Sequence, residues 1–477
     1  MKKPPIIFAL ILTIFSCQNQ QKNKAKTSTF STEEKADSII IKKIFDSALT
    51  KGKSYNWLRD LTQNIGGRMS GSPEAEMAVK WGEKVMNEVG LDSVWLQPAK
   101  VAHWVRGKKE IAHYSINGKK INIAVTALGG SVATPKNGVT AEVIEVKSIK
   151  EAQDLGEKLR GKIVFFNRPF NNAIVNTFSA YGGCVDQRTS GTGVVSKFGP
   201  KAVLVRSVTN KIDNYPHTGI MRYGDTPKDQ YVPAAAISTL AAEKLSLDLK
   251  KNPNLKVYLK QSCKNLPKAN SFNVIGEIKG RENPEKIMVV SGHLDSWDLA
   301  EGAHDDGAGV VQALEVLHLF KINNIKPKNT IRVVFFMDEE QGKGGPNAYA
   351  ESVKLKKEVH IGALDADSGG HTPRGFTINA NEQNTKHLQS WKKLLSPYGL
   401  HDLIKGGSGS NIRKLKGETV TLVGYTPDSQ RYFDYHHTAI DTFDKVNKRE
   451  LELGSASMAS LVYLMDKYLN NPNTVKQ

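Results

Sequence analysis

The fold is decided by the stretch Ile287-Met288-Val289-Val290-Ser291-Gly292-His293-Leu294-Asp295, an apolar run that ends in a histidine and a carboxylate. Such a run predicts a buried strand that delivers His293 to the edge of a sheet. If the extended conformation continues, Asp295 lies on the same face and accepts the second ring N–H of His293. Because open α/β sheets bind ligands at the carboxyl ends of their strands, this edge is a candidate site.

The region around this stretch alternates between strand-like and helix-like runs from about residue 272 onward. Strands are expected at 287–290 and 331–336, helices at 310–320 and 347–356, and a closing amphipathic helix at 450–469. The alternation predicts the fold class as α/β, a sheet flanked by helices on both faces.

The preceding part of the chain has a different texture. Residues from about 36 to 97 carry helical periodicity, whereas short β-type runs separated by Gly and Pro fill the region from about 120 to 265. Since 477 residues exceed the size of one ordinary domain, we expect this second region to be a separate β-rich unit.

Four further segments of the α/β region place acids or histidines where strands should stop; they span residues 302–309, 333–342, 362–370 and 435–442. Taken alone, an Asp-Asp-Gly turn usually caps a helix and a single histidine is usually structural. Adjacent carboxylates, however, repel each other and are costly to bury unless a cation neutralises them. Two histidines and three carboxylates together form a ligand set suited to Zn²⁺ and too large for one tetrahedral ion. The combination predicts a paired hydrolytic metal centre.

The composition is that of a globular protein with a basic surface. The formal charge is +18, but Lys and Arg are scattered through every region, so no nucleic-acid partner is predicted. With only three cysteines there is no disulfide framework and no cysteine-based metal site. Whether Cys184 and Cys263 pair is left open.

The N-terminal segment MKKPPIIFALILTIFSC, residues 1–17, has a basic start and an apolar run too short to cross a membrane. Its end, Ile14-Phe15-Ser16-Cys17, resembles a bacterial lipobox, which implies a lipoprotein signal peptide and a lipid on Cys17. An ordinary signal peptide is the alternative. Residues 18–35 are polar and aperiodic, as in a flexible linker. The expected location is the cell envelope, in the periplasm or at the outer membrane, or the extracellular space.

The motifs SGHLD, HDDGAG, DEEQGKGG, DADSGG and HHTAIDT occur in this order between residues 291 and 442. Together with IGGRMSGSPE, AHWVRG, LVRSVT and PHTGI, they resemble the M28 family of zinc aminopeptidases and carboxypeptidases, and within it the carboxypeptidase Q group. The resemblance covers about residues 45 to 470. It implies a peptidase domain formed by residues 36–125 and 269–472, with a protease-associated (PA) domain inserted at 126–268.

The resemblance also implies roles for individual residues. Two Zn²⁺ ions would be held by His293 and Asp367 and by Glu340 and His437, with Asp305 bridging; Glu339 would be the general base, Asp295 would orient His293, and the Asp305–Asp306 peptide bond would be cis. Asp365 competes with Asp367, and His436 with His437. Asn411 stands where the family usually has Asp, which puts substrate positioning in doubt.

The implied function is exopeptidase hydrolysis of dipeptides and other short peptides, with N-terminal and C-terminal trimming both open. The Gly-rich segment near Gly406 and the segment near Pro427 are expected to line the substrate pocket. Two other functions are weighed: a non-catalytic peptide-binding protein and a one-zinc transferase like glutaminyl cyclase. The expected partners are a short peptide and the membrane, through Cys17. The oligomeric state is not determined, and a homodimer is one of the states allowed.

Overall fold

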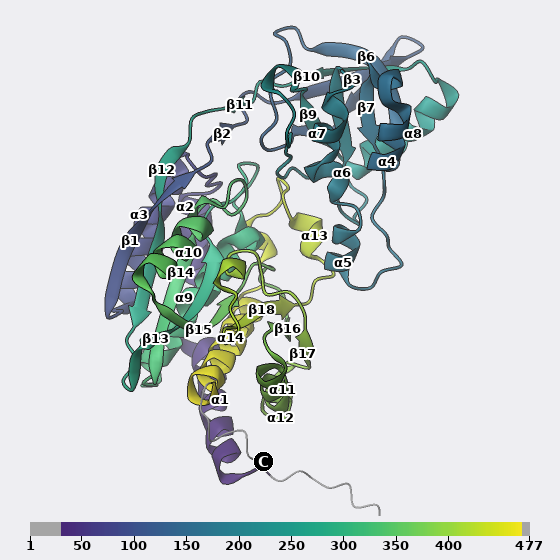
Figure 1. The fold of residues 1–477 in the computed structure, drawn as a ribbon. Coiled ribbons are helices and arrows are strands. Elements are labelled where there is room, and N and C mark those ends of the chain that lie inside the picture. Colours follow the sequence, from purple (N-terminus) through teal and green to yellow (C-terminus); the bar gives the residue numbers. More distant parts are fainter. Residues whose placement is uncertain (1–29, 470–477) are drawn as a thin grey trace, which may run out of the picture.

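The computed structural model describes residues 30–469. The predicted signal peptide and the lipid on Cys17 lie outside these residues. Figure 1 shows two sheets, each with its own helices; the chain passes from the first to the second after Val101 and returns before Ala269. Among residues 30–469, no helix combines the length and apolar character of a membrane span.

The first sheet has the strand order β1-β12-β14-β13-β15-β18-β16-β17. Its central strand β13 (Asn283–His293) is parallel to β14 (Asn329–Phe336) on one side and to β15 (Val359–Asp365) on the other. β18 (Thr421–Pro427) is parallel to β15. The outer strands are β1 (Ser93–Val101), β12 (Ala269–Ile278), β16 (Pro373–Asn379) and β17 (Asp402–Lys405). Four parallel strands therefore end at one edge, and three of them, β13, β14 and β15, end next to the predicted site.

Helices cover both faces of this sheet, which confirms the predicted α/β fold class. Met288 and Val290 of β13 point into the core formed with α1 (Thr32–Lys51), α2 (Ser54–Asn64), α3 (Pro73–Val89), α9 (Ala308–Ile322) and α14 (Lys448–Tyr468). The intervening Ile287 and Val289 point into the opposite core, which contains Tyr349 of α10 (Gly344–Lys356). Both sets are buried because successive side chains of a strand point to opposite faces.

The helical region predicted at 36–97 ends earlier than expected. α1, α2 and α3 lie within it, but residues 93–97 belong to β1, which pairs antiparallel with β12. The prediction of helix was wrong for these residues, because pairing with a strand about 175 positions away outweighs the local pattern.

The second sheet has the order β4-β3-β10-β6-β7-β8-β9-β5. Its strands are β3 (Ile111–Ile116), β4 (Lys119–Ile123), β5 (Val125–Ala127), β6 (Val139–Val146), β7 (Ile163–Phe166), β8 (Ala202–Arg206), β9 (Ala234–Ile237) and β10 (Lys256–Lys260). It has two apolar cores of its own, to which α4 (Ile149–Leu155), α7 (Gly191–Ser196) and α8 (Thr239–Lys251) contribute. The unit is therefore α/β and begins with β3, so the boundary expected at residue 126 falls inside the sheet.

One segment of this second unit contacts the unit that contains the first sheet. We call residues 167–190 the arm; it contains α5 (Thr177–Gly182) and α6 (Asp186–Thr189). In Figure 1, α5 lies next to α13 (Tyr432–Tyr435). Phe170 and Cys184 of the arm share an apolar cluster with Tyr432 and Phe433. The arm thus packs against α13, which ends two residues before the predicted ligand His437.

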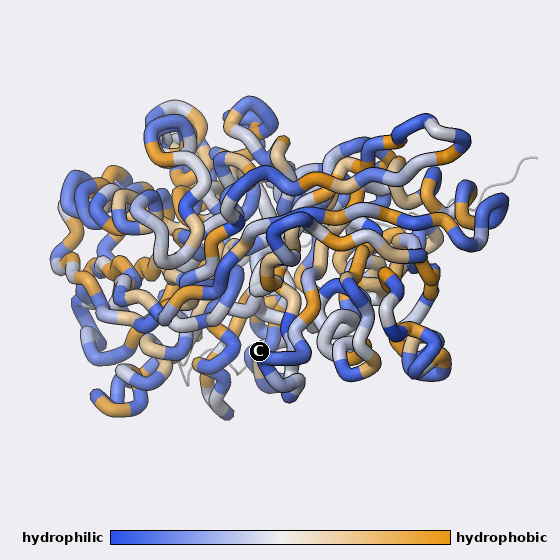
Figure 2. The backbone as a smooth tube through the Cα atoms, turned by 90° about the horizontal axis from the view of Figure 1, so that it is seen from above, coloured by the Kyte–Doolittle hydropathy of each residue, from blue (hydrophilic) through white to orange (hydrophobic). Residues whose placement is uncertain are grey.

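Hydrophilic and hydrophobic residues alternate in short stretches along most of the chain in Figure 2. The two remaining cysteines are buried. Cys184 and Cys263 are both free thiols in the structure, in different apolar clusters. Burial raises the pKa of each thiol to about 11, so both stay protonated at neutral pH.

Candidate metal centre

The predicted ligands converge at the carboxyl edge of the first sheet. His293 is the last residue of β13, Glu340 follows β14, and Asp367 follows β15. Because these three strands are parallel neighbours, their ends meet at one edge. Asp305 and His437 arrive differently from what the sequence predicts: Asp305 precedes α9 and His437 follows α13, so neither stands at a strand end.

Asp305 lies between the two histidines. Its Oδ1 is 3.4 Å from Nε2 of His293, and its Oδ2 is 3.2 Å from Nε2 of His437. Nε2 of His437 is also 3.1 Å from Oε2 of Glu340, and Nε2 of His293 is 3.6 Å from Oδ1 of Asp367. One carboxylate thus directs its two oxygens at two different imidazoles, each of which has a further carboxylate beside it.

The turn that carries Asp305 is held by its neighbours. The Asp305–Asp306 peptide bond is cis, as predicted. The Asp306 carboxylate accepts hydrogen bonds from the backbone N–H groups of His293, at 2.9 Å, and Gly309, at 3.0 Å. Asp306 therefore ties this turn to the end of β13 and to the start of α9.

The arrangement fits zinc. Ligands about 2.05 Å from a tetrahedral zinc ion are themselves about 3.3 Å apart, close to the nitrogen–oxygen distances of 3.1–3.6 Å given above. Oδ2 of Asp305 and Oε1 of Glu340 are buried and have no hydrogen-bond partner within residues 30–469. Buried carboxylate oxygens of this kind call for a cation. Imidazole nitrogens with carboxylate oxygens are donors that zinc accepts.

Of the two competing aspartates, Asp367 lies beside His293 and Asp365 does not. The Asp365 carboxylate accepts hydrogen bonds from Oγ of Ser291, at 2.8 Å, and from Nδ2 of Asn411, at 3.1 Å. Burial, followed by the nearby charge of Asp367, raises the pKa of Asp365 to about 7. Asp365, the last residue of β15, thus ties the end of this strand to Ser291 of β13 and to Asn411.

Asn411, which stands where the family usually has Asp, contacts Asp365 in the structure. Its amide donates to the Asp365 carboxylate, where an aspartate would put two buried carboxylates in contact. The hydrogen bonds that Asn411 donates all go to Asp365, which is not one of the five predicted ligands. Gly409, two residues earlier, has φ 92°, and a Cβ there would lie 2.1 Å from Oδ2 of Asp365, so only glycine fits.

Of the two adjacent histidines, His437 has the closer contacts. Nε2 of His436 lies 3.7 Å from Oδ2 of Asp305, and the two imidazole rings are stacked with centroids 3.5 Å apart. Nδ1 of His437 lies 3.2 Å from the carbonyl oxygen of Thr218, which holds the ring as metal ligands require. Nδ1 of His436 has no such partner within the described chain.

Asp295 acts through a different contact from the one the sequence suggested. β13 ends at His293, so the strand alternation does not extend to Asp295, and its carboxylate stays 3.9 Å from Nδ1 of His293. The backbone oxygen of Asp295 is the partner of Nδ1, at 2.9 Å. The carboxylate accepts instead from the backbone N–H groups of Glu339, at 3.1 Å, and Glu340, at 3.2 Å. Asp295 therefore positions the two glutamates as well as His293.

We expect Asp295→Asn to lower kcat/KM by about 10–100-fold and to weaken zinc binding, because contacts behind a metal ligand are worth about that much. The amide would turn one acceptor oxygen into an NH₂ group facing an N–H donor. Steady-state kinetics and competition with a chelator measure both effects. Asp229→Asn, at an exposed position of the second unit, is the matched control. Kinetics and zinc affinity equal to wild type would disprove this role.

The Glu339 carboxylate lies near His293 and Asp367, and one of its two oxygens is hydrogen-bonded. Oε1 accepts from Nζ of Lys343, at 2.7 Å, and from the hydroxyl of Ser410. Burial alone would raise the pKa of Glu339, but His293 and Lys343 outweigh it and lower the pKa. The carboxylate is therefore ionised at neutral pH and able to accept a proton. Ser410 brings the loop that begins at Gly406 next to it.

Three supporting residues were not assigned a role from the sequence. Arg68 is buried and donates to the backbone oxygens of residues 294, 301 and 302 at 2.5–3.0 Å. Asp441 accepts from the backbone N–H groups of residues 304 and 305, at 2.7 and 3.1 Å. Trp297 Nε1 donates to Oε2 of Glu340 at 2.7 Å. Arg68 and Asp441 lie within quoted motifs and Trp297 follows SGHLD by two residues, but the pattern gives no sign of whether these side chains bind metal, substrate or backbone.

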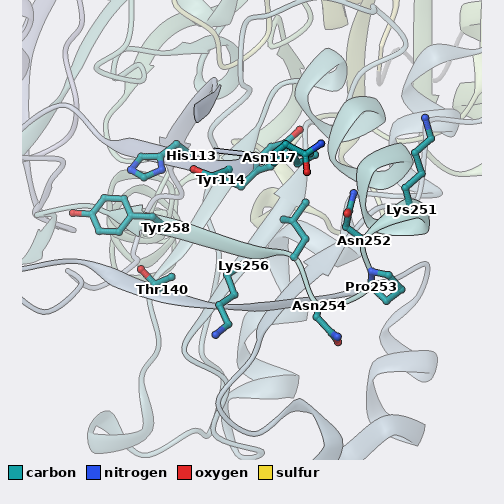
Figure 3. A pocket seen from close by; sticks show the side chains of 13 residues that line it. His113, Tyr114, Asn117, Thr140, Lys251, Asn252, Pro253, Asn254, Lys256 and Tyr258 are labelled. Carbon is teal, nitrogen blue, oxygen red and sulfur yellow. The ribbon is translucent and has the colours of Figure 1, made fainter. Parts of the chain in front are cut away.

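A hollow in another part of the structure contains none of the predicted site residues. It measures about 740 Å³ and lies in the second unit, where Figure 3 shows His113, Tyr258 and Lys256 along its wall. These side chains belong to β3 and β10 or their flanks, on the second sheet. The hollow takes no part in the metal centre.

The chain is similar in sequence and fold to known peptidases. Residues 273–462 match the profile of Peptidase family M28. Carboxypeptidase Q from Bos taurus is 33% identical over 431 residues, which cover 90% of this chain and 88% of that protein. Aminopeptidase YwaD from Bacillus subtilis is 21% identical over 89% of this chain and 87% of its own length. A crystal structure of a Peptidase M28 precursor from Shewanella amazonensis superposes with a TM-score of 0.86 at 29% identity, covering 91% of this chain and 97% of that one.

Proposed function

Because the chain is a carboxypeptidase Q-like member of peptidase family M28, it is a zinc metallo-exopeptidase, and we propose that it hydrolyses dipeptides and other short peptides at a two-zinc centre. The observation that carries the proposal is the Asp305 carboxylate, whose two oxygens face two different histidines at 3.4 and 3.2 Å. A single four-coordinate ion would leave part of this five-residue set unused.

We assign His293 and Asp367 to one ion, Glu340 and His437 to the other, and Asp305 to both. The zinc ions, when bound, supply Lewis acidity that makes a water molecule more acidic and polarises the scissile carbonyl group. The side chains of the protein supply the geometry: Trp297 holds Glu340, and the carbonyl oxygen of Thr218 holds His437.

Glu339 handles the protons in this proposal. Its carboxylate accepts a proton from the attacking water as the water oxygen bonds to the carbonyl carbon. It then gives that proton to the amide nitrogen as the carbon–nitrogen bond breaks, so that a free carboxylate and a free amine are released. Before Glu339 takes up the proton, Lys343 and Ser410 keep its carboxylate ionised and oriented.

The second unit, from β3 to β10, is proposed to be the PA domain inserted in the peptidase, with an earlier start than residue 126. Its arm and the carbonyl oxygen of Thr218 touch the peptidase beside the metal centre. This supports a role of the inserted unit in completing the active site.

We further propose that the enzyme is secreted and held at the cell envelope by a lipid on Cys17. The support is the pattern of residues 1–17, a basic start and an apolar run that ends in Ile14-Phe15-Ser16-Cys17. Cys17→Ser is expected to move the enzyme from the membrane fraction to the soluble fraction. Equal partition of both forms on fractionated cells would contradict the anchor.

A panel of peptides tests the catalytic proposal. Free, N-acetylated and C-amidated dipeptides are incubated with zinc-loaded protein, with chelated protein, and with chelated protein to which zinc is returned. We expect zinc-dependent hydrolysis of free dipeptides. Loss on C-amidation identifies a carboxypeptidase, as the similarity to carboxypeptidase Q favours, and loss on N-acetylation an aminopeptidase.

The same panel separates the rival functions. Peptide binding without hydrolysis by zinc-loaded protein would overturn the catalytic proposal in favour of a binding protein. One zinc per chain with cyclisation of an N-terminal glutamine would instead indicate a transferase.

A further inference from the structure

The arm brings two polar side chains of the second unit to the metal centre. Nη2 of Arg188 donates to the hydroxyl oxygen of Tyr181 at 2.6 Å. Nη1 of Arg188 lies 3.4 Å from Nδ1 of His437 and donates to the carbonyl oxygen of Thr218 at 3.3 Å. The Tyr181 ring meets the His436 ring edge-on with centroids 5.3 Å apart. The phenol therefore stands beside His436, and the guanidinium group that contacts it stands beside His437.

The Tyr181 hydroxyl group has a proton with no acceptor. Its oxygen accepts from Arg188, and a phenol carries only one hydrogen to donate. Within residues 30–469, no atom accepts that hydrogen. Tyr181 is half-buried as a residue, and the hydrogen of its hydroxyl group is left free to meet a ligand.

The Tyr181 ring is fixed before any substrate arrives. It stacks on Phe433 with centroids 4.8 Å apart and an interplanar angle of 20°. Next to it, Oγ1 of Thr177 donates to the carbonyl oxygen of Ser429 at 2.9 Å. A donor that needs no reorganisation is the kind that stabilises charge developing in a transition state.

Electrostatics keep this donor protonated. Burial raises the pKa of Tyr181, Arg188 lowers it in part, and the charges of Glu340 and Asp305 raise it further. The phenol thus keeps its hydrogen at neutral pH. The guanidinium group that donates to the phenol oxygen also makes the remaining O–H a stronger donor.

We propose that Tyr181 is a catalytic residue, supplied by the inserted unit, that donates a hydrogen bond to the scissile carbonyl oxygen as the carbonyl carbon becomes tetrahedral. Arg188 is the positioning residue that orients and polarises it. The inference rests on the proposed peptidase function and adds to it a role for the arm, because closing the site then requires the second unit.

Tyr181→Phe removes only the hydroxyl group. We expect kcat to fall by about 10²–10³-fold, the usual cost of losing one such donor, with KM changed far less. Zinc content should equal that of wild type. Affinity for a phosphinic dipeptide analogue, which mimics the tetrahedral state, should fall by the same factor as kcat/KM when measured by calorimetry. Affinity for the amino-acid products should not change.

Tyr114→Phe is the matched control, since that hydroxyl lies in the second sheet and donates to Asp248. It should leave kcat, KM, zinc content and both affinities unchanged. The inference is overturned if Tyr181→Phe raises KM alone, if it loses zinc, or if analogue binding stays at the wild-type value. Absence of hydrolysis by the wild-type protein in the same assay would instead overturn the proposed function. The two failures are therefore distinguishable.

Discussion

Replacing Glu339 with glutamine is expected to lower kcat by about 10²–10⁴-fold while zinc content and the fold stay unchanged. The amide has the same shape as the carboxylate but cannot accept a proton from water. Oε1 of Glu339 already accepts from Lys343 and Ser410, and the amide oxygen of glutamine can keep both contacts. We therefore expect KM to stay close to the wild-type value and the loss of activity to appear in kcat.

Elemental analysis for zinc, thermal unfolding and steady-state kinetics check this result together. Glu351→Gln, an exposed change on α10, controls for the loss of one negative charge. A Glu339→Gln enzyme that keeps wild-type kcat would remove Glu339 from the mechanism. Loss of zinc by this variant would show that the residue is a ligand and not the base.

Asp305→Ala should have the largest effect on metal binding. The Asp305 carboxylate lies 3.4 Å from Nε2 of His293 and 3.2 Å from Nε2 of His437. Contacts behind a ligand are worth about 10–100-fold in metal affinity, so removing a ligand shared by two ions should cost more than about 100-fold. We expect fewer than two zinc ions per chain and no measurable hydrolysis at micromolar zinc.

Stoichiometry by elemental analysis after dialysis, and the rise in melting temperature on adding zinc, measure the change. A ligand bound only by the native state raises the melting temperature, so the variant should show a smaller rise than wild type. Asp229→Ala, in an exposed loop of the second unit, is the control. Retention of two tightly bound ions by Asp305→Ala would contradict the bridging assignment.

Much of the fold could be predicted from local patterns. Val289 and Val290 belong to a run whose burial on both faces marks a central strand, and the helix after Gly307 starts where the apolar pattern begins. The strand at residues 93–97 could not be predicted, because its partner is β12 and not a neighbour in sequence. The start of the second unit was misplaced for the same reason, since β3 pairs with β10.

The sequence by itself determined the fold class and the types and order of the candidate ligands, because acids placed after apolar strands must face water or a cation. Only the tertiary structure decided which side chains meet. It placed Asp367 and not Asp365 beside His293, and it turned the Asp295 carboxylate toward the backbone of the glutamates. It also placed Tyr181 beside His436, some 250 residues further along the chain. Such distances depend on packing between separate units, and no local pattern encodes them.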